Sequence, residues 1–212
     1  MRSVLVLALM AACCAADAAE RSIPLFSSGQ IAGSPPSACD SALTGNAGGP
    51  PRWQFVQQGD RSGLAEVSRE KLDARYPLCI VKDVRATDLE IAVDLIPQEG
   101  EIDRAGGLAF RLQDRNNYFV VRANALENNV RLYRTVNGNR IQFAGADTPV
   151  ASGKPQRLAV KIAGDLITVS FAGKQLFEVR DTTFRTSGGI ALWSKADSFT
   201  LFANLTVDVS RE

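Results

Sequence analysis

The sequence predicts an all-β fold built from two packed antiparallel sheets. Apolar and polar residues alternate with a period of two in several short segments, and helix signals are nearly absent. Because neighbouring side chains of a strand point to opposite faces, such segments are typical of half-buried strands. Turn signals recur about every 8–12 residues, and that spacing favours a two-sheet sandwich.

The predicted strands follow one another from Trp53 to Val207. The segment 88–95 shows the pattern most clearly, because Leu89 and every second residue after it are apolar while acidic residues and an alanine lie between them. The turns Ala163-Gly164-Asp165 and Ala172-Gly173-Lys174 separate strands of the same kind. Further strands are expected at 108–112, 158–162, 167–171, 175–179, 189–193 and 199–207.

Residues 1–18 have the features of an export signal. Arg2 is followed by an apolar run at 4–12 that is too short to span a bilayer, and small residues then supply a cleavage site. We therefore expect a periplasmic or extracellular protein. In the alternative reading, the segment is a lipoprotein signal with Cys13 or Cys14 as the lipidated residue.

The rest of the chain divides into an N-terminal arm at 19–52 and a sandwich domain at 53–212. The stretch 27–51 is rich in Ser, Gly, Pro and Ala, a composition that cannot build a core. Cys39 lies in this arm, and Cys79 is the other cysteine left after the signal. Two cysteines in an exported protein usually pair, so we expect a Cys39–Cys79 disulfide; two free thiols are the alternative.

Composition limits the function classes. The net charge is +1, so no general attraction to nucleic acid is expected, and no second apolar run is long enough for a membrane span. The chain has no histidine, which excludes Ser-His-Asp and Cys-His catalysis. No glycine-rich phosphate loop is present, and we predict neither a cofactor nor a metal site. Any catalysis would depend on carboxylates, or on a metal held by oxygen ligands.

The segment 116–133 holds the strongest candidate site, two strands joined by a polar turn. Tyr118, Val120, Arg122 and Asn124 share one face of the first strand. Burying an unpaired Arg and Asn is costly, so two readings stand side by side. Either Arg122 bonds a nearby carboxylate, Asp114 or Glu127, or this face forms a polar groove for a hydroxyl-rich ligand.

Other residues allow chemistry but have simpler explanations. Trp193 could stack on a sugar ring, although a tryptophan is more often buried. Glu101-Ile102-Asp103 matches half of the Glu-x-Asp-x-x-Glu motif of retaining β-glucanases, but Gly106 takes the third acidic position. The segment is therefore interpreted as a solvated loop. The carboxylates considered for catalysis are Glu101, Asp103, Asp114, Glu127 and Asp197.

Four motifs together resemble a known family. They are Gly106-Gly107-Leu108-Ala109-Phe110-Arg111, Asp114-x-x-Asn117-Tyr118, Val121-Arg122-Ala123-Asn124-Ala125-Leu126-Glu127-x-Asn129 and Leu192-Trp193-Ser194-Lys195-Ala196-Asp197-Ser198. The chain resembles exported bacterial proteins of the concanavalin A-like lectin/glucanase superfamily, and in particular the 3-keto-disaccharide hydrolase domain family. The resemblance implies a jelly-roll sandwich of two antiparallel sheets and a carbohydrate-related role.

Three function classes follow. The first is a carbohydrate-binding or interaction domain without catalysis, the second a carboxylate-based glycoside or keto-glycoside hydrolase, and the third a structural domain that binds a protein partner. The absence of histidine and of a complete acid pair favours the first. The predicted ligand-binding residues are Arg111, Asp114, Arg122, Asn124, Glu127, Trp193, Lys195 and Asp197.

Overall fold

The structure, a computed structural model, describes residues 21–25 and 29–209. This part of the chain contains strands and no helix. The strands are β1 (Arg21–Ile23), β2 (Cys39–Thr44), β3 (Trp53–Gln58), β4 (Arg61–Glu66), β5 (Tyr76–Ala86), β6 (Leu89–Glu99), β7 (Ala105–Asp114), β8 (Asn117–Asn124), β9 (Asn129–Val136), β10 (Asn139–Asp147), β11 (Gln156–Ala163), β12 (Leu166–Phe171), β13 (Lys174–Arg180), β14 (Gly188–Trp193) and β15 (Phe199–Val209).

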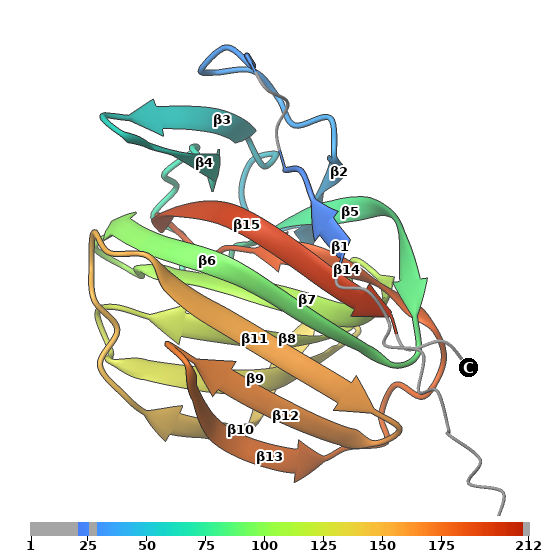
Figure 1. Cartoon of the computed structure of the whole chain (residues 1–212). Helices are drawn as coiled ribbons and strands as arrows, with labels where there is room; N and C mark the ends of the chain where they lie inside the picture. Colours follow the sequence, from blue (N-terminus) through green and yellow to red (C-terminus); the bar gives the residue numbers. More distant parts are fainter. Residues whose placement is uncertain (1–20, 26–28, 210–212) are drawn as a thin grey trace, which may run out of the picture.

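The strands form two antiparallel sheets, which Figure 1 shows as two layers. The eight-stranded sheet has the order β13-β12-β11-β6-β15-β4-β3, with β1 also paired to β15. The seven-stranded sheet has the order β10-β9-β8-β7-β14-β5-β2. The prediction of an all-β, two-sheet antiparallel jelly-roll sandwich is confirmed.

The main core lies between the two sheets. The alternation predicted for 88–95 is present in β6, where Leu89, Ile91, Val93 and Leu95 are at most 1% exposed. From the facing sheet, the inward residues of β8, such as Phe119, pack into the same cluster. These side chains hold the sheets together because burying each one fully contributes about 1.5–3 kcal/mol.

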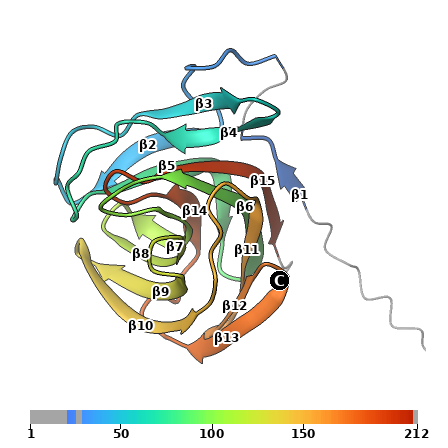
Figure 2. The same ribbon diagram turned by 90° about the vertical axis from the view of Figure 1, so that its left-hand side faces the viewer.

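The seven-stranded sheet is so curved that its two edges approach each other across its outer face, the face turned away from the eight-stranded sheet (Figure 2). Thr44, at the end of edge strand β2, lies 2.6 Å from the Tyr118 hydroxyl in β8, measured between side-chain oxygens. The next residue, Gly45, donates its backbone N–H to Asn116 Oδ1 at 2.8 Å. From the other edge strand, Arg140 of β10 reaches the ring of Tyr76 in β5.

This curvature gives the outer face an apolar cluster of its own. The face was expected to be wet or ligand-binding along β8, yet Tyr118 and Val120 are fully buried. They pack with Leu78 of β5 and Trp193 of β14. The outer face is therefore dry where the edges meet.

Two pieces of the expected N-terminal arm are strands of the sandwich. β1 pairs with β15, and β2 pairs with β5 along its whole length. Ala42 of β2 also contacts the apolar cluster of the outer face. Residues 21–23 and 39–44 of the expected arm thus contribute one strand to each sheet, although the composition did not suggest it, because strand pairing depends on the backbone and needs few large side chains.

The predicted disulfide between Cys39 and Cys79 is confirmed. The two Cα atoms are 5.3 Å apart, and both side chains are buried. The bond joins β2 to β5, and a disulfide is compatible with export. The expected signal at 1–18, including Cys13 and Cys14, lies outside the described residues. Within them, no helix is long and apolar enough to cross a membrane.

Candidate functional site

Four of the eight predicted site residues meet in one group at the end of the sandwich where β6 finishes, on the left of Figure 1. They lie on β8, on the β8–β9 turn and just after β14, and a fifth, Asp197, holds the neighbouring loop. We call the group the polar cluster: Asp103, Arg122, Asn124, Glu127, Asn129 and Lys195.

Arg122 is buried, and both of its terminal guanidinium nitrogens bind neighbouring side chains, whereas its Nε has no hydrogen-bond partner among the described residues. Its Nη1 donates to Asn129 Oδ1 at 2.6 Å, and its Nη2 donates to Glu127 Oε2 at 2.7 Å and to the Tyr133 hydroxyl at 3.2 Å. The side chain is only 5% exposed. Arg122 pairs with Gly107 on the adjacent β7. A Cβ at position 107 would lie 3.1 Å from the Arg122 Cβ and would clash with the Val121 carbonyl oxygen. These contacts favour the structural reading of Arg122, a support for the residues around it.

Asn124 and Lys195 both bind Asp103, on the loop between β6 and β7. Asn124 Nδ2 donates to Asp103 Oδ1 at 2.8 Å, and Lys195 Nζ lies 2.7 Å from Asp103 Oδ2. Burial raises the pKa of Asp103, although Lys195 and Arg122 oppose the shift. Burial alone would lower the pKa of Lys195, but Asp103 and Asp73 outweigh it and raise that pKa.

Asp197 fixes the same loop from its other side. Its carboxylate accepts backbone N–H groups of Glu101 at 2.8 Å, and of Ile102 and Asp103 at 3.1 Å. Burial alone would raise the pKa of Asp197, but these donors together outweigh it and lower that pKa. A pocket of about 290 Å³ lies beside the loop. It is lined by Arg69, Lys71, Glu99, Gly100, Glu101, Arg104 and Asp197.

Glu127 is the accessible member of the polar cluster. Its side chain is 47% exposed while it holds Arg122 and accepts Asn129 Nδ2 at 3.1 Å. Burial opposes ionisation, but Arg122 and Asn129 outweigh it and lower the pKa of Glu127. Two partly or fully exposed polar side chains, Arg131 and Gln142, belong to the same outer face, because they pair in register with Arg122 and Tyr133.

Trp193 lies beside the polar cluster but is fully buried. Its ring stacks on Tyr76 with centroids 5.7 Å apart, and the guanidinium of Arg140 lies 5.4 Å from it. The simpler expectation for this tryptophan, a core position, agrees with these contacts.

The structure does not bring Arg111 and Asp114 to the polar cluster, contrary to the expectation for Arg122. The pairing of β7 with β8 shifts between Phe110 and Asp114, and Arg111 has a φ of 44° in this irregular stretch. This bulge turns Arg111 away from the outer face. Its guanidinium donates instead to the carbonyls of Thr87 at 2.9 Å and Phe184 at 2.7 Å.

Asp114 has a local role at the β7–β8 turn. It accepts the backbone N–H of Asn116 at 2.6 Å and the side-chain amide of Asn117. This is a turn contact of the kind that Asp commonly makes.

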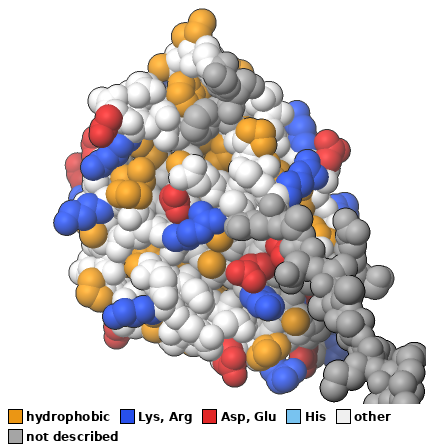
Figure 3. Space-filling model, viewed as in Figure 1, with side chains coloured by type: hydrophobic (Ala, Val, Ile, Leu, Met, Phe, Trp, Pro, Cys, Tyr) orange, Lys and Arg blue, Asp and Glu red, His pale blue; other side chains and the backbone are white. Residues whose placement is uncertain are grey.

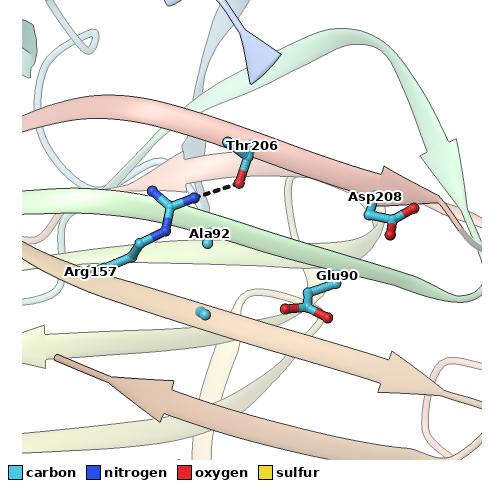
Figure 4. Close-up of a pocket in the computed structure, with 6 residues that line it drawn as sticks. Glu90, Ala92, Arg157, Thr206 and Asp208 are labelled. Atoms are coloured by element: carbon cyan, nitrogen blue, oxygen red, sulfur yellow. Dashed lines mark hydrogen bonds between the residues drawn. The ribbon is translucent and has the colours of Figure 1, made fainter. Parts of the chain in front are cut away.

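A second pocket, of about 220 Å³, lies on the eight-stranded sheet (Figure 4). Arg157 Nη2 donates to Thr206 Oγ1 at 2.6 Å across it. Glu90 and Asp208 are cross-strand partners, yet Figure 4 shows their carboxylates pointing in different directions. Such a pair does not enclose a glycosidic bond between two facing carboxyl groups. Acidic and basic side chains are interspersed over this face of the molecule (Figure 3).

Three residues of the outer face were missed by the sequence reasoning. Asn129 and Tyr133 bind Arg122, and Arg140 contacts Tyr133, Tyr76 and Trp193. The period-two pattern of β9 puts Asn129 and Tyr133 on a common face. Knowing how β9 pairs with β8 would have shown that this face is the one that carries Arg122. No pattern in the sequence indicated that Arg140 of β10 contacts rings of β5 and β14.

Comparison with solved structures shows that the chain shares the fold of galectin-like β-sandwiches. The chain is 16% identical to the carbohydrate binding module CBM66 from Bacillus subtilis, with a TM-score of 0.63, over 81% of this chain and 97% of that one. A B. subtilis protein of unknown function with a galectin-like fold is 14% identical, with a TM-score of 0.57, over 81% and 91%.

A functionally unknown protein from Saccharomyces cerevisiae is 9% identical, with a TM-score of 0.51, over 76% of this chain and 97% of that one. No protein-family model and no curated protein matches the chain. At such low identities the likeness concerns the fold, and function has to be argued from the site.

Proposed function

We propose that this chain is an exported carbohydrate-binding domain without catalysis of its own, which binds a saccharide on the outer face of the seven-stranded sheet beside Glu127. The observation that carries the proposal is the polar cluster with its exposed carboxylate. Planar amide, guanidinium and carboxylate groups in fixed positions suit a ligand that is covered with hydroxyl groups.

The cluster holds its shape because its buried members bind one another. Arg122 connects Glu127 and Asn129, and Asn124 ties the end of β8 to Asp103. Glu127 therefore presents its carboxylate from a defined position without needing to reorganise. Pre-organisation of this kind lowers the entropy cost of binding.

The proposed roles differ between exposed and buried residues. Glu127 accepts hydrogen bonds from sugar hydroxyls, while Arg131 and Gln142 supply further polar contacts from β9 and β10. Arg122 is a positioning residue, since it is buried and its Nη1 and Nη2 already donate inside the protein. Lys195 and Asp197 hold the loop that carries Asp103.

A second candidate function, a carboxylate-based glycoside hydrolase such as the 3-keto-disaccharide family would suggest, has one observation in its favour. The environment raises the pKa of Asp103 and lowers that of Glu127, the separation expected for an acid and a base. However, Asp103 is 1% exposed and held by Lys195 and Asn124. A carboxyl group so enclosed cannot reach a glycosidic oxygen, and this favours the binder.

A glycan array combined with a reducing-sugar assay tests the proposal. We expect wild type to bind at least one saccharide and to release no reducing sugar. Glu127→Gln should weaken binding about tenfold, the effect of losing one strong charge-assisted hydrogen bond. The matched control is Glu90→Gln, an exposed glutamate on the other sheet, which should bind like wild type.

Three outcomes oppose the proposal. Turnover of any saccharide would establish the hydrolase instead. Equal loss of binding in the two glutamate variants would place the ligand elsewhere. Silence in both assays would favour a domain that binds a protein partner.

A further inference from the structure

Three aromatic rings surround the guanidinium of Arg140 on the outer face. The Arg140 Cζ lies 4.3 Å from the ring centroid of Tyr133, 4.7 Å from that of Tyr76 and 5.4 Å from that of Trp193. The rings come from β9, β5 and β14, so they meet only because the sheet is curled. Arg140 itself lies on edge strand β10 and is partly exposed.

Arg140 differs from its neighbouring arginines because it has no carboxylate partner among residues 21–25 and 29–209. Arg122, Arg131 and Arg134 each bind an acidic residue. The Arg140 side chain makes no hydrogen bond in this part of the chain, and its Nη1 is buried without an acceptor.

The Arg140 side chain is therefore only weakly fixed against the three rings. Its contacts with the rings are favourable, but the buried Nη1 has lost its water without gaining an acceptor, and these two contributions are of similar size. A long side chain on an edge strand can also rotate into solvent, where all of its donors are hydrated. Displacing the Arg140 side chain from the rings consequently costs little.

Two more buried polar atoms lie beside the rings. Trp193 Nε1 and Thr135 Oγ1 make no hydrogen bond within the described residues, and both side chains are fully buried. Both atoms lie near the Tyr118 hydroxyl and interact with it electrostatically, while the short contact of that hydroxyl is with Thr44. Their hydrogen-bonding capacity is therefore not fully used within the protein, and a ligand hydroxyl group would complete it.

We propose that Tyr76, Tyr133 and Trp193 form a second saccharide subsite, which Arg140 occupies in the ligand-free protein. A sugar ring displaces the guanidinium, stacks on the aromatic faces and brings hydroxyl groups to Trp193 Nε1 and Thr135 Oγ1. The inference rests on the proposed function and extends it. Tyr133 connects the two places, because its hydroxyl accepts a hydrogen bond from Arg122 in the polar cluster.

The first test needs no ligand. The chain has two tryptophans, so Trp53→Phe leaves Trp193 as the single reporter. We expect acrylamide to quench Trp193 fluorescence weakly in this background and several-fold more strongly after Arg140→Ala. Arg140→Lys should give an intermediate value, because lysine keeps the charge and the stem but not the planar group. It also provides a second variant if Arg140→Ala folds poorly.

The second test measures affinity for the best saccharide from the array. Arg140→Ala should bind it about five- to tenfold more tightly than wild type, because the subsite no longer has to be emptied. The matched control is Arg180→Ala, which removes an exposed arginine from β13, the edge strand of the other sheet, and should bind like wild type.

The outcomes separate the two proposals. Unchanged quenching in Arg140→Ala would overturn the subsite, since Arg140 would then not cover the rings. If wild type binds saccharide and Arg140→Ala binds equally or less tightly, the subsite is wrong and the proposed function stands. If quenching rises but no variant binds any saccharide, the proposed function fails, and the subsite fails with it.

Discussion

The Lys195–Asp103 ion pair should be the most consequential polar contact of the site. Replacing Lys195 with methionine keeps most of the side-chain volume and removes the charge next to a carboxylate that is 1% exposed. The lost partner lies 2.7 Å from Asp103 Oδ2. Asn124 remains bonded to Asp103, but an amide cannot neutralise the charge.

The expected loss in the free energy of unfolding at pH 7 is about 3–5 kcal/mol, the cost of leaving a buried charge without its partner. The exposed pair between Lys195 and Asp73 adds about 0–1 kcal/mol, since surface pairs contribute little. Asp103→Asn should cost less, about 1–3 kcal/mol, because Lys195 keeps Asp73. The variant that combines Lys195→Met with Asp103→Asn should lose about 2 kcal/mol less unfolding free energy than the two single losses added together.

Urea unfolding of the four proteins at pH 7 and pH 4.5 measures these values. The folded-state pKa of Asp103 is raised above its unfolded value, so its contribution to stability is largest at low pH and is lost as the pH rises through the folded pKa. Without Lys195 this pKa rises further. The Lys195→Met loss should therefore shrink at pH 4.5. A loss below about 1 kcal/mol at pH 7, or one that does not shrink at low pH, would show that Asp103 is not a buried charge that depends on Lys195.

Three further predictions concern other parts of the fold. Gly107→Ala should destabilise the protein by about 1–3 kcal/mol in thermal unfolding, because the new Cβ meets the Val121 carbonyl, and a melting curve like that of wild type would contradict this. Cys39→Ser with Cys79→Ser should cost about 4 kcal/mol, since the bond closes a loop with a sequence separation of 40, and a loss under about 1 kcal/mol would be too small for that mechanism. Because the folded-state pKa of Glu127 is lowered, Glu127 stabilises the fold at pH values above its unfolded-state pKa, and this stability is lost as the pH falls through the folded-state pKa. Glu127→Gln should flatten this part of the curve of unfolding free energy against pH, and an unchanged curve would exclude the Arg122–Glu127 pair as its source.

Local patterns predicted the strands well because each strand's alternation reflects which face is buried. Leu89 and its apolar partners in β6 lie in the core as expected. The same rule placed Tyr118, Val120, Arg122 and Asn124 on one face of β8, which the structure reproduces. It did not predict that the face would be dry at Tyr118, because the curling of the whole sheet is a tertiary property.

The misplaced residues show which information a period-two pattern lacks. Arg111 was expected near Arg122, but the bulge in β7 changes its direction, and no residue type in that segment marks a bulge. Asp103 was assigned to a solvated loop, although it is buried and held by Lys195, just after β14, and by Asn124 at the end of β8. Contacts between elements far apart in sequence decide both cases.

The proposed function requires a saccharide to bind the outer face of the seven-stranded sheet beside Glu127. The most direct measurement is an NMR titration of the isotope-labelled protein with the saccharide selected by the array, followed through backbone amide shifts. We expect the largest shifts on the β8–β9 turn and the facing parts of β9 and β10, around Glu127, Arg131 and Gln142. Shifts confined to the eight-stranded sheet around Glu90 and Arg157, or no shifts at millimolar saccharide, would contradict it.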